Sequence, residues 1–142
     1  MRSAFLEQNS GVTAGVKKKV ETVLAARTLT NDDSGKVFML DAAGGAYAVT
    51  LPTALEDGVY YKFVVSEETP TGAMTIAAGS AIVSMVMKDA GGNASNSTAG
   101  TQVSNVIIGT SAQKGDYINI MAAGNEWVAE CLSSIDDAVT TS

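Results

Sequence analysis

The chain has 142 residues, enough for one compact domain that buries roughly 70% of the surface of its unfolded form. It has a formal net charge of −6, no histidine and a single cysteine, Cys131, which excludes His-dependent catalytic triads, the usual zinc sites and a framework of intramolecular disulfides. The acidic balance argues against nucleic acid as a partner, and no apolar stretch is long enough to predict a signal peptide or a membrane span. We therefore expect a globular protein with neither cofactor nor metal, and no membrane partner.

The first 27 residues carry a charge opposite to that of the rest of the chain. They have a balance of +3, against −9 for the remainder. Val12, Val16, Val20, Val23 and Leu24 would share one stripe of a helix, but the valines and glycines make an isolated helix weak, so an extended arm is equally compatible. The turn-forming sequence TNDDSG follows at residues 30–35. We expect an N-terminal arm or short helix over residues 1–30 and a separate domain over residues 31–142. The basic residues of the leader are Arg2, Lys17, Lys18, Lys19 and Arg27.

From residue 37 onward the pattern predicts about eight short strands separated by turn signals. Alternation is clear where it can be tested, since Tyr47, Val49 and Leu51 would point to one side of a sheet. No helix-length segment interrupts the series, so we predict an all-β sandwich, jelly-roll-like, with a small barrel as the related alternative. The predicted strands are VFML from Val37, AYAVTL from Ala46, VYYKFVV from Val59, MTIA from Met74, AIVSMVM from Ala81, QVSNVII from Gln102, YINIM from Tyr117 and WVAEC from Trp127.

The stretch KDAGGNASNSTAGT, residues 88–101, is predicted to be an exposed loop because it is rich in Gly, Ser, Asn and Ala. Loops of this kind often make contacts, so Asn93 and Asn96 are candidate contact residues. The alternative is a solvent-facing loop without function.

Motifs that carry chemistry are incomplete. GVTAGVKKK at Gly11 lacks the spacing and the Ser or Thr of a phosphate-binding loop, and the pairs Asp32-Asp33 and Asp136-Asp137 lack the register of a calcium loop. The remaining carboxylates fall at turns and strand edges, so no catalytic residue is predicted. Five aromatic residues could form a sugar-binding platform, but their alternation favours packing in a core or an interface. These are Tyr47, Tyr60, Tyr61, Tyr117 and Trp127.

Three segments together resemble a recurrent β module of tailed-bacteriophage virion proteins. They are TLTNDDSGKVFMLDAAGGAYAVTLPTALEDGVYYKFVV from Thr28, MTIAAGSAIV from Met74 and KGDYINIMAAGNEWVAE from Lys114. The resemblance covers about Thr28 to Glu130 and its motifs are structural. The group includes head decoration (cement) proteins and modules of tail fibres and spikes, which assemble and do not catalyse.

The resemblance, the short chain and the basic leader imply a capsid decoration protein. Such a protein would be a non-enzymatic virion protein on the phage head surface, assembled in the host cytoplasm. It would bind the major capsid protein and itself, as a homotrimer, and would stabilise the icosahedral shell. Lys17, Lys18, Lys19 and Arg27 are the candidate capsid-binding residues. The alternative is a tail-fibre or carbohydrate-binding adhesion module.

Overall fold

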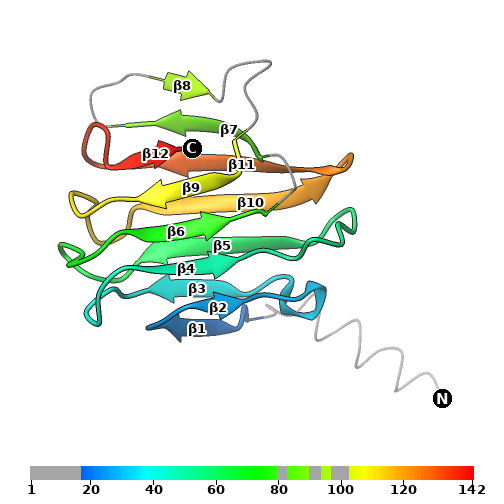
Figure 1. Cartoon of the computed structure of the whole chain (residues 1–142), viewed down its shortest axis with the longest axis horizontal. Helices are drawn as coiled ribbons and strands as arrows, with labels where there is room; N and C mark the ends of the chain where they lie inside the picture. The colour runs from blue at the N-terminus through cyan, green and yellow to red at the C-terminus, as the bar shows by residue number, and fades with distance from the viewer. Residues whose placement is uncertain (1–16, 80–82, 90–93, 97–102) are drawn as a thin grey trace.

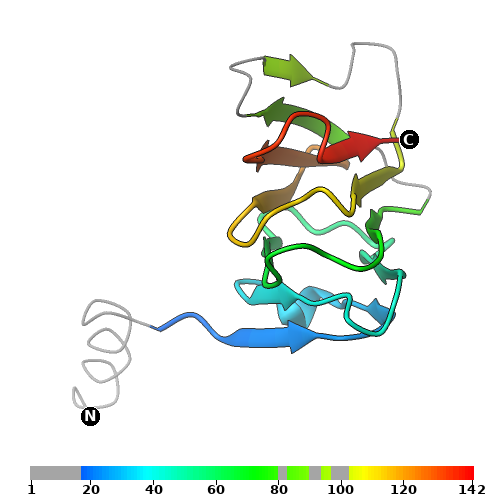
Figure 2. The ribbon, with the colours of Figure 1, turned by 90° about the vertical axis from the view of Figure 1, so that its left-hand side faces the viewer.

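Two β-sheets packed face to face make up the protein (Figures 1 and 2). The computed structural model describes residues 17–79, 83–89, 94–96 and 103–142. The seven-stranded sheet has the order β1 (Val20–Val23), β3 (Val37–Leu40), β5 (Tyr60–Val65), β10 (Tyr117–Ala123), β11 (Glu126–Leu132), β7 (Val83–Lys88) and β8 (Ala94–Asn96). The five-stranded sheet has the order β12 (Val139–Thr141), β9 (Asn105–Ile108), β6 (Met74–Ala77), β4 (Tyr47–Thr50) and β2 (Arg27–Thr28). A 3-10 turn, η1 (Asn31–Asp33), links β2 to β3.

The predicted all-β sandwich is confirmed, and each of the eight expected strands has a counterpart, although Ala81, Ile82 and Gln102 lie outside the described residues. The connectivity differs from that of a jelly roll, in which neighbouring strands are antiparallel. Here β1, β3 and β5 are parallel to one another, as are β2, β4 and β6, and β7 runs parallel to β11. The remaining strand pairs are antiparallel.

The parallel pairs arise because the first half of the chain coils between the two sheets. Each strand from β1 to β6 is followed in the sequence by a strand of the opposite sheet. Up to β6, when the chain returns to a sheet, its new strand lies beside the preceding strand of that same sheet. Figure 2 shows these turns stacked along the molecule. Parallel neighbours need a long crossover, and a strand of the other sheet supplies it here in place of a helix.

The second half of the chain extends both sheets. Strand β9 pairs with β6 and then with β12, while β10 is inserted between β5 and β11. The β10–β11 hairpin turns at Gly124 and Asn125, both with positive φ. The hairpin therefore provides the centre of the seven-stranded sheet.

Two strands lie ahead of the boundary expected at residue 30, so the sheets begin within the predicted arm. Val20–Val23 pairs in register with Val37–Leu40, and Arg27 and Thr28 pair with Val49 and Thr50. Val23 and Leu29 are buried in the core. The valine spacing that suited a helical stripe also suits a strand, and a parallel neighbour stabilises the extended form. Residues 1–16 lie outside the described part of the chain.

The space between the sheets is filled by the inward side of each strand. Trp127 and Tyr61 are fully buried with ring centroids 5.9 Å apart, and Phe38 stacks on Phe63 at 5.6 Å. Valine, leucine and isoleucine from both sheets surround these rings. The core is thus anchored by four large side chains, which offset the small aromatic content of the chain.

The turn at Asp57-Gly58 begins β5 and is tied to the β10–β11 hairpin. Gly58 has a φ of 92° and donates its N–H to the carbonyl of Ala122 at 2.8 Å. The N–H of Gly124 donates to Asp57 Oδ1 at 3.1 Å. A glycine suits this left-handed position, and the turn holds β5 in register beside β10.

Candidate interaction face

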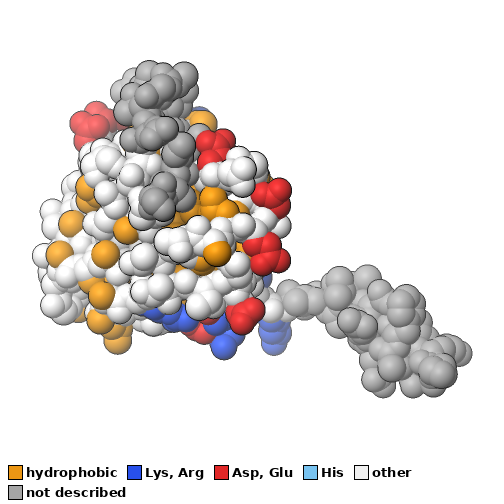
Figure 3. Space-filling model, turned by 45° about the vertical axis from the view of Figure 1, so that its right-hand side comes forward, with side chains coloured by type: hydrophobic (Ala, Val, Ile, Leu, Met, Phe, Trp, Pro, Cys, Tyr) orange, Lys and Arg blue, Asp and Glu red, His pale blue; other side chains and the backbone are white. Residues whose placement is uncertain are grey.

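The outer faces of the two sheets differ in chemistry. The five-stranded sheet presents mainly small and polar side chains, as expected for a sheet with one solvated face, with Ile107 as a larger apolar one. These include Ala48, Thr50, Thr75, Ala77 and Asn105. Figure 3 looks partly onto this sheet and shows many uncoloured side chains among the scattered apolar ones.

The outer face of the seven-stranded sheet carries large apolar side chains. Tyr60 is 42% exposed, Met121 and Val128 are each 44% exposed, and Val86 is 56% exposed. The outward positions of β3, β5 and β10 add partly exposed apolar groups. We call this surface the seven-stranded face. It is formed by the neighbouring strands β1, β3, β5, β10, β11 and β7. Their described outward residues are Val20, Thr22, Val37, Met39, Tyr60, Lys62, Val64, Tyr117, Asn119, Met121, Ala123, Glu126, Val128, Glu130, Leu132, Val86 and Lys88.

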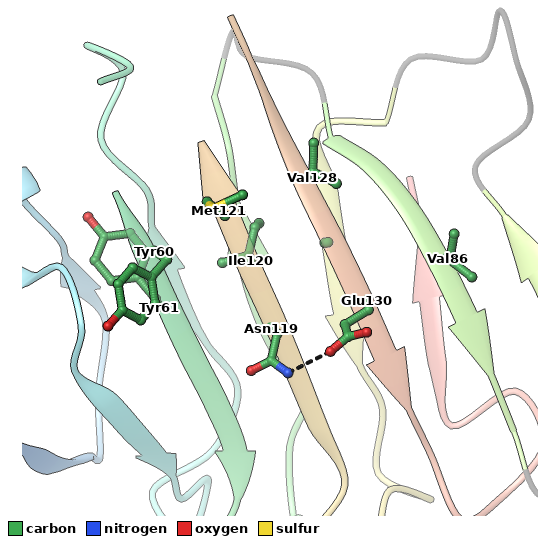
Figure 4. A pocket seen from close by; sticks show the side chains of 9 residues that line it. Tyr60, Tyr61, Val86, Asn119, Ile120, Met121, Val128 and Glu130 are labelled. Carbon is green, nitrogen blue, oxygen red and sulfur yellow. Dashed lines mark hydrogen bonds between the residues drawn. The ribbon is translucent and has the colours of Figure 1, made fainter. Parts of the chain in front are cut away.

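The centre of the seven-stranded face is hollowed into a shallow groove of about 560 Å³. Figure 4 shows Tyr60 on one side, Val86 on the other, and Met121, Asn119, Val128 and Glu130 between them. Asn119 Nδ2 donates a hydrogen bond to Glu130 Oε1 at 2.8 Å. The groove is mostly apolar and contains one fixed polar pair, which suits the binding of a surface and offers no nucleophile with an adjacent base.

Five charged residues form a separate network at the β1 edge of the molecule. Glu21 accepts from Lys19 at 3.3 Å, from Lys36 at 3.1 Å and from Arg27 at 2.5 Å. Asp33 accepts from Lys36 at 2.6 Å and from Arg27 at 3.3 Å. Both acids therefore share two cations, and the network ties β1 and β2 to η1 and to the start of β3.

The network shifts the pKa of its acids. The hydrogen bond from Arg27 and then that from Lys36 lower the pKa of Glu21 to about 2. Burial raises the pKa of Asp33, but the hydrogen bonds from Lys36 and the Thr30 N–H outweigh this, so its pKa is lowered. The hydrogen bond to Asp33 raises the pKa of Lys36. All these groups are charged at neutral pH and act as structural ion pairs.

The candidate capsid-binding cations fall into two environments. Lys17, Lys18 and Lys19 are exposed just ahead of the edge strand β1. Arg27 is half-buried, engaged by both acids, and lies 5.1 Å from the centre of the Phe38 ring. In Figure 3 the basic side chains gather at this lower end of the molecule, whereas acidic ones spread along the edge above it. Arg27 is therefore used within the fold, whereas the three lysines are exposed, and Lys19 also pairs with Glu21.

The two candidate loop asparagines are separated from the lysines. Asn93 lies outside the described residues. Asn96 belongs to β8, where its backbone pairs with Val86 at the far end of the seven-stranded sheet from β1. The sequence predicted a loop here. The backbone of residues 94–96 is a short edge strand instead, because its N–H and C=O groups pair with those of β7.

The five aromatic residues do not form a single platform. Trp127 and Tyr61 are core residues, and Tyr61 donates its hydroxyl to the Thr30 carbonyl at 2.7 Å. Tyr47 packs on the core and donates to the Val23 carbonyl at 2.8 Å. Tyr60 and Tyr117 project from the seven-stranded face. Packing explains three of the five rings, and the other two belong to the outer surface.

Several buried and part-buried polar groups have structural partners, whereas the buried Trp127 Nε1 has no hydrogen-bond partner among the described residues. Asp116 accepts from the N–H groups of Gln113 and Ser134, each at 2.9 Å, and so joins the loops before β10 and after β11. Glu67 accepts from the Ala42 N–H. Burial, and secondarily Asp116, raises the pKa of the Cys131 thiol to about 12. These groups are held by the fold and are not poised to react.

The adjacent acids at the C-terminal turn have one further acidic neighbour. A hydrogen bond with Asp89 raises the pKa of Asp136, and Asp137 adds to the effect. Asp137 has a φ of 56°, a left-handed conformation that aspartate can adopt in turns. Among the described residues, no group of three or more His, Cys, Asp or Glu side chains could hold a metal ion.

Comparisons add no family. No protein-family model and no curated protein sequence matches the chain. Within residues 17–79, 83–89, 94–96 and 103–142, no helix has the length and hydropathy needed to cross a membrane.

The seven-stranded face is the feature that the sequence did not reveal. Its signal was present in strands with apolar residues on both faces, such as Val128 and Leu132 beside Trp127 and Ala129. An edge strand with exposed apolar residues and a central strand with a covered outer face give the same pattern. The order of strands in the sheet was needed to show that these residues share one open surface.

Proposed function

We propose that the protein is a non-enzymatic structural protein of a phage virion, which decorates the head shell by binding the major capsid protein. The observation that carries the proposal is the use of polar groups in the fold. The described buried acids and the charged network hold turns and strands together, while the outward features are an apolar sheet face and the exposed Lys17–Lys19 run. Such a protein has surfaces for assembly, and its described residues include no arranged catalytic groups. The sequence resemblance over Thr28 to Glu130 supplies the virion context.

Attachment would use the lysine run, and the body would supply self-association. Lys17, Lys18 and Lys19 are exposed at one end of an otherwise acidic chain, so they would be attracted to an acidic patch of the shell. Each contact is modest, but many copies bound to linked sites add by avidity. A homotrimer is the assembly implied by the resemblance, and it belongs to this proposal.

Co-sedimentation with heads assembled without this protein tests the attachment. Replacing Lys17, Lys18 and Lys19 together by Gln should weaken binding several-fold at low salt, with a smaller difference at high salt because exposed charges are screened over about 8 Å at physiological ionic strength. The matched control is K114Q, which removes an exposed lysine away from the seven-stranded face and should bind normally. Equal binding by the triple variant and the control would contradict attachment through the lysine run.

A carbohydrate-binding adhesion module is the second candidate, favoured by one observation. Tyr60 lies exposed on the groove that also contains the Asn119–Glu130 pair, and an aromatic ring beside polar groups is suited to a sugar. Screening the purified chain against immobilised glycans tests this function. Binding that is lost in Y60A and retained in Y60F would favour adhesion over decoration.

A further inference from the structure

We propose that the seven-stranded face binds a second copy of this chain through a two-fold axis that runs parallel to β10. This inference does not depend on the virion proposal, since it rests on the register of three strands and the charges on them. It names a two-fold contact, which differs from the three-fold contact of the expected homotrimer.

The first observation is the arrangement of side chains in rows across β5, β10 and β11. Asn119 on β10 lies opposite Lys62 on β5 and Glu130 on β11, so the middle row has a cation on one side and an anion on the other. A second row joins Tyr60, Met121 and Val128. On the other side of the charged row, Val64, Tyr117 and Leu132 form a third, apolar row.

A two-fold axis parallel to β10 gives every row a matching partner. The rotation keeps β10 over β10 and places β5 of one copy over β11 of the other. Lys62 of each copy then faces Glu130 of the other, so two ion pairs form. Tyr60 faces Val128 in one apolar row, and Val64 faces Leu132 in the other.

The competing two-fold orientation is disfavoured by the same charges. An axis in the interface but perpendicular to the strands would place Lys62 over Lys62 and Glu130 over Glu130. Like charges brought together in a partly desolvated contact strongly destabilise it. The charge pattern therefore favours the axis parallel to β10 over the axis perpendicular to the strands.

Lys62 and Glu130 are available for these contacts. Lys62 Nζ lies 4.6 Å from the centre of the Tyr117 ring, and in the part of the chain that is described this lysine has no carboxylate within ion-pair distance. Glu130 accepts a hydrogen bond from the Asn119 amide. This amide is neutral, so it orients the carboxylate without neutralising its charge. Packed sheets lie about 10 Å apart, a gap that a lysine and a glutamate extending toward each other can span.

The face has the size of a modest interface. Strands lie about 4.8 Å apart and rise about 3.3 Å per residue. The five neighbouring strands β3, β5, β10, β11 and β7 therefore cover on the order of 500 Å² in projection. Standard interfaces bury roughly 800 Å² of accessible surface on each partner, and an accessible surface with side chains exceeds its projection. We therefore expect a reversible dimer of micromolar affinity, since buried area alone does not ensure tight binding.

Charge reversal tests the geometry. The full chain and the variants K62E and E130K are measured separately by sedimentation velocity from about 5 to 500 µM, a range that brackets a micromolar dissociation constant. The unmodified chain should dimerise, whereas each variant should dimerise roughly 30-fold or more weakly because both ion pairs become repulsive. An equimolar mixture of K62E and E130K should recover the dimer, because both contacts then join opposite charges.

Circular dichroism and thermal unfolding establish that each variant is folded, and K114E, an exposed reversal away from the face, is the matched control that should dimerise normally. M121K probes the apolar centre, where two lysines would face each other on the axis, and should abolish the dimer. A monomeric unmodified chain over this range would overturn the proposal. So would a trimer that dissociates into no dimer, single reversals that associate like the unmodified chain, or a mixture that fails to recover.

Discussion

Asp33 illustrates how one side chain fixes several segments. Its Oδ2 accepts from the Thr30 N–H at 2.9 Å, and its Oδ1 accepts from Lys36 at 2.6 Å and Arg27 at 3.3 Å. The first bond caps η1, and the other two hold β2 and the start of β3. The turn role that the sequence indicated for this aspartate is therefore correct, and the ion pairs add to it.

The Tyr61 hydroxyl is a second residue-scale link, because its bond to the Thr30 carbonyl crosses from β5 to the segment before η1. Y61F should lower the free energy of unfolding by about 1 kcal/mol, the typical contribution of one such bond. Y60F is the matched control, since the neighbouring ring is exposed, and should change stability little. Urea unfolding measures both, and equal effects would show that the buried bond contributes nothing.

The pKa of Glu21 predicts how stability depends on pH. Because its pKa is lowered from 4.5 to about 2 in the folded chain, its stabilising effect is complete above pH 4.5 and is lost as the pH falls toward 2. E21Q should therefore be less stable than the unmodified chain at pH 7, with the difference shrinking below pH 4.5. Urea unfolding at several pH values measures this, and E68Q, at an exposed position, should show no such trend. A difference that stays constant down to pH 2 would contradict the ion-pair reading.

At the scale of elements, the fold depends on loops that pack against each other between successive turns of the chain. Thr71 Oγ1 donates to the Ala42 carbonyl at 2.6 Å, and the Tyr47 N–H donates to the Ala73 carbonyl at 3.2 Å. These bonds join the loop before β4 to the loop before β6. Parallel strands β4 and β6 are thereby started in register.

Gly72 is required where those loops meet. A Cβ at this position would lie 2.3 Å from the Ala46 backbone nitrogen, a contact that only a backbone shift could relieve. G72A should therefore destabilise the protein by about 3 kcal/mol or more. G58A is the control, because a Cβ there meets nothing within 4 Å and only the positive φ is strained, for about 1 kcal/mol. Thermal unfolding compares the two, and a G72A variant no less stable than G58A would contradict the close approach.

For the whole molecule, the two sheets have different tasks. The inner sides of both build the core, the outer side of the five-stranded sheet meets water, and the outer side of the seven-stranded sheet is apolar enough to meet a protein. The charged network closes the β1 edge, where the chain enters the body. Strand β1, which lies within the expected N-terminal arm, is therefore part of the seven-stranded sheet.

Truncation tests where the body begins. Deleting residues 1–16 removes none of the described contacts and should leave the unfolding midpoint nearly unchanged. Deleting residues 1–27 removes β1, the buried Val23 and the Arg27 ion pairs, and should lower the midpoint by about 10 °C, corresponding to about 3 kcal/mol for a chain of this size. Equal midpoints for both truncations would instead support a body that starts at residue 31.

The sequence determined the strands whose signal is local. Alternating apolar residues specified the eight central strands, and Asp-Gly and Gly-rich turns separated them, because side-chain period and turn conformation depend on neighbouring residues. The missed strands are short edge elements. Val20–Val23, Arg27–Thr28, Ala94–Asn96 and Val139–Thr141 have between two and four residues each, and a neighbouring ladder rather than their own pattern makes them strands.

Only the tertiary structure decided which strands are neighbours, and with them the parallel coil and the candidate interaction face. Lys62, Asn119 and Glu130 come from two distant parts of the sequence, and their shared row exists because β10 is inserted between β5 and β11. The lysine run could be recognised from composition, but Arg27 could not be assigned to the fold until Glu21 and Asp33 were found beside it. Composition and periodicity are properties of a segment, whereas a sheet face and an ion-pair network are properties of long-range pairing.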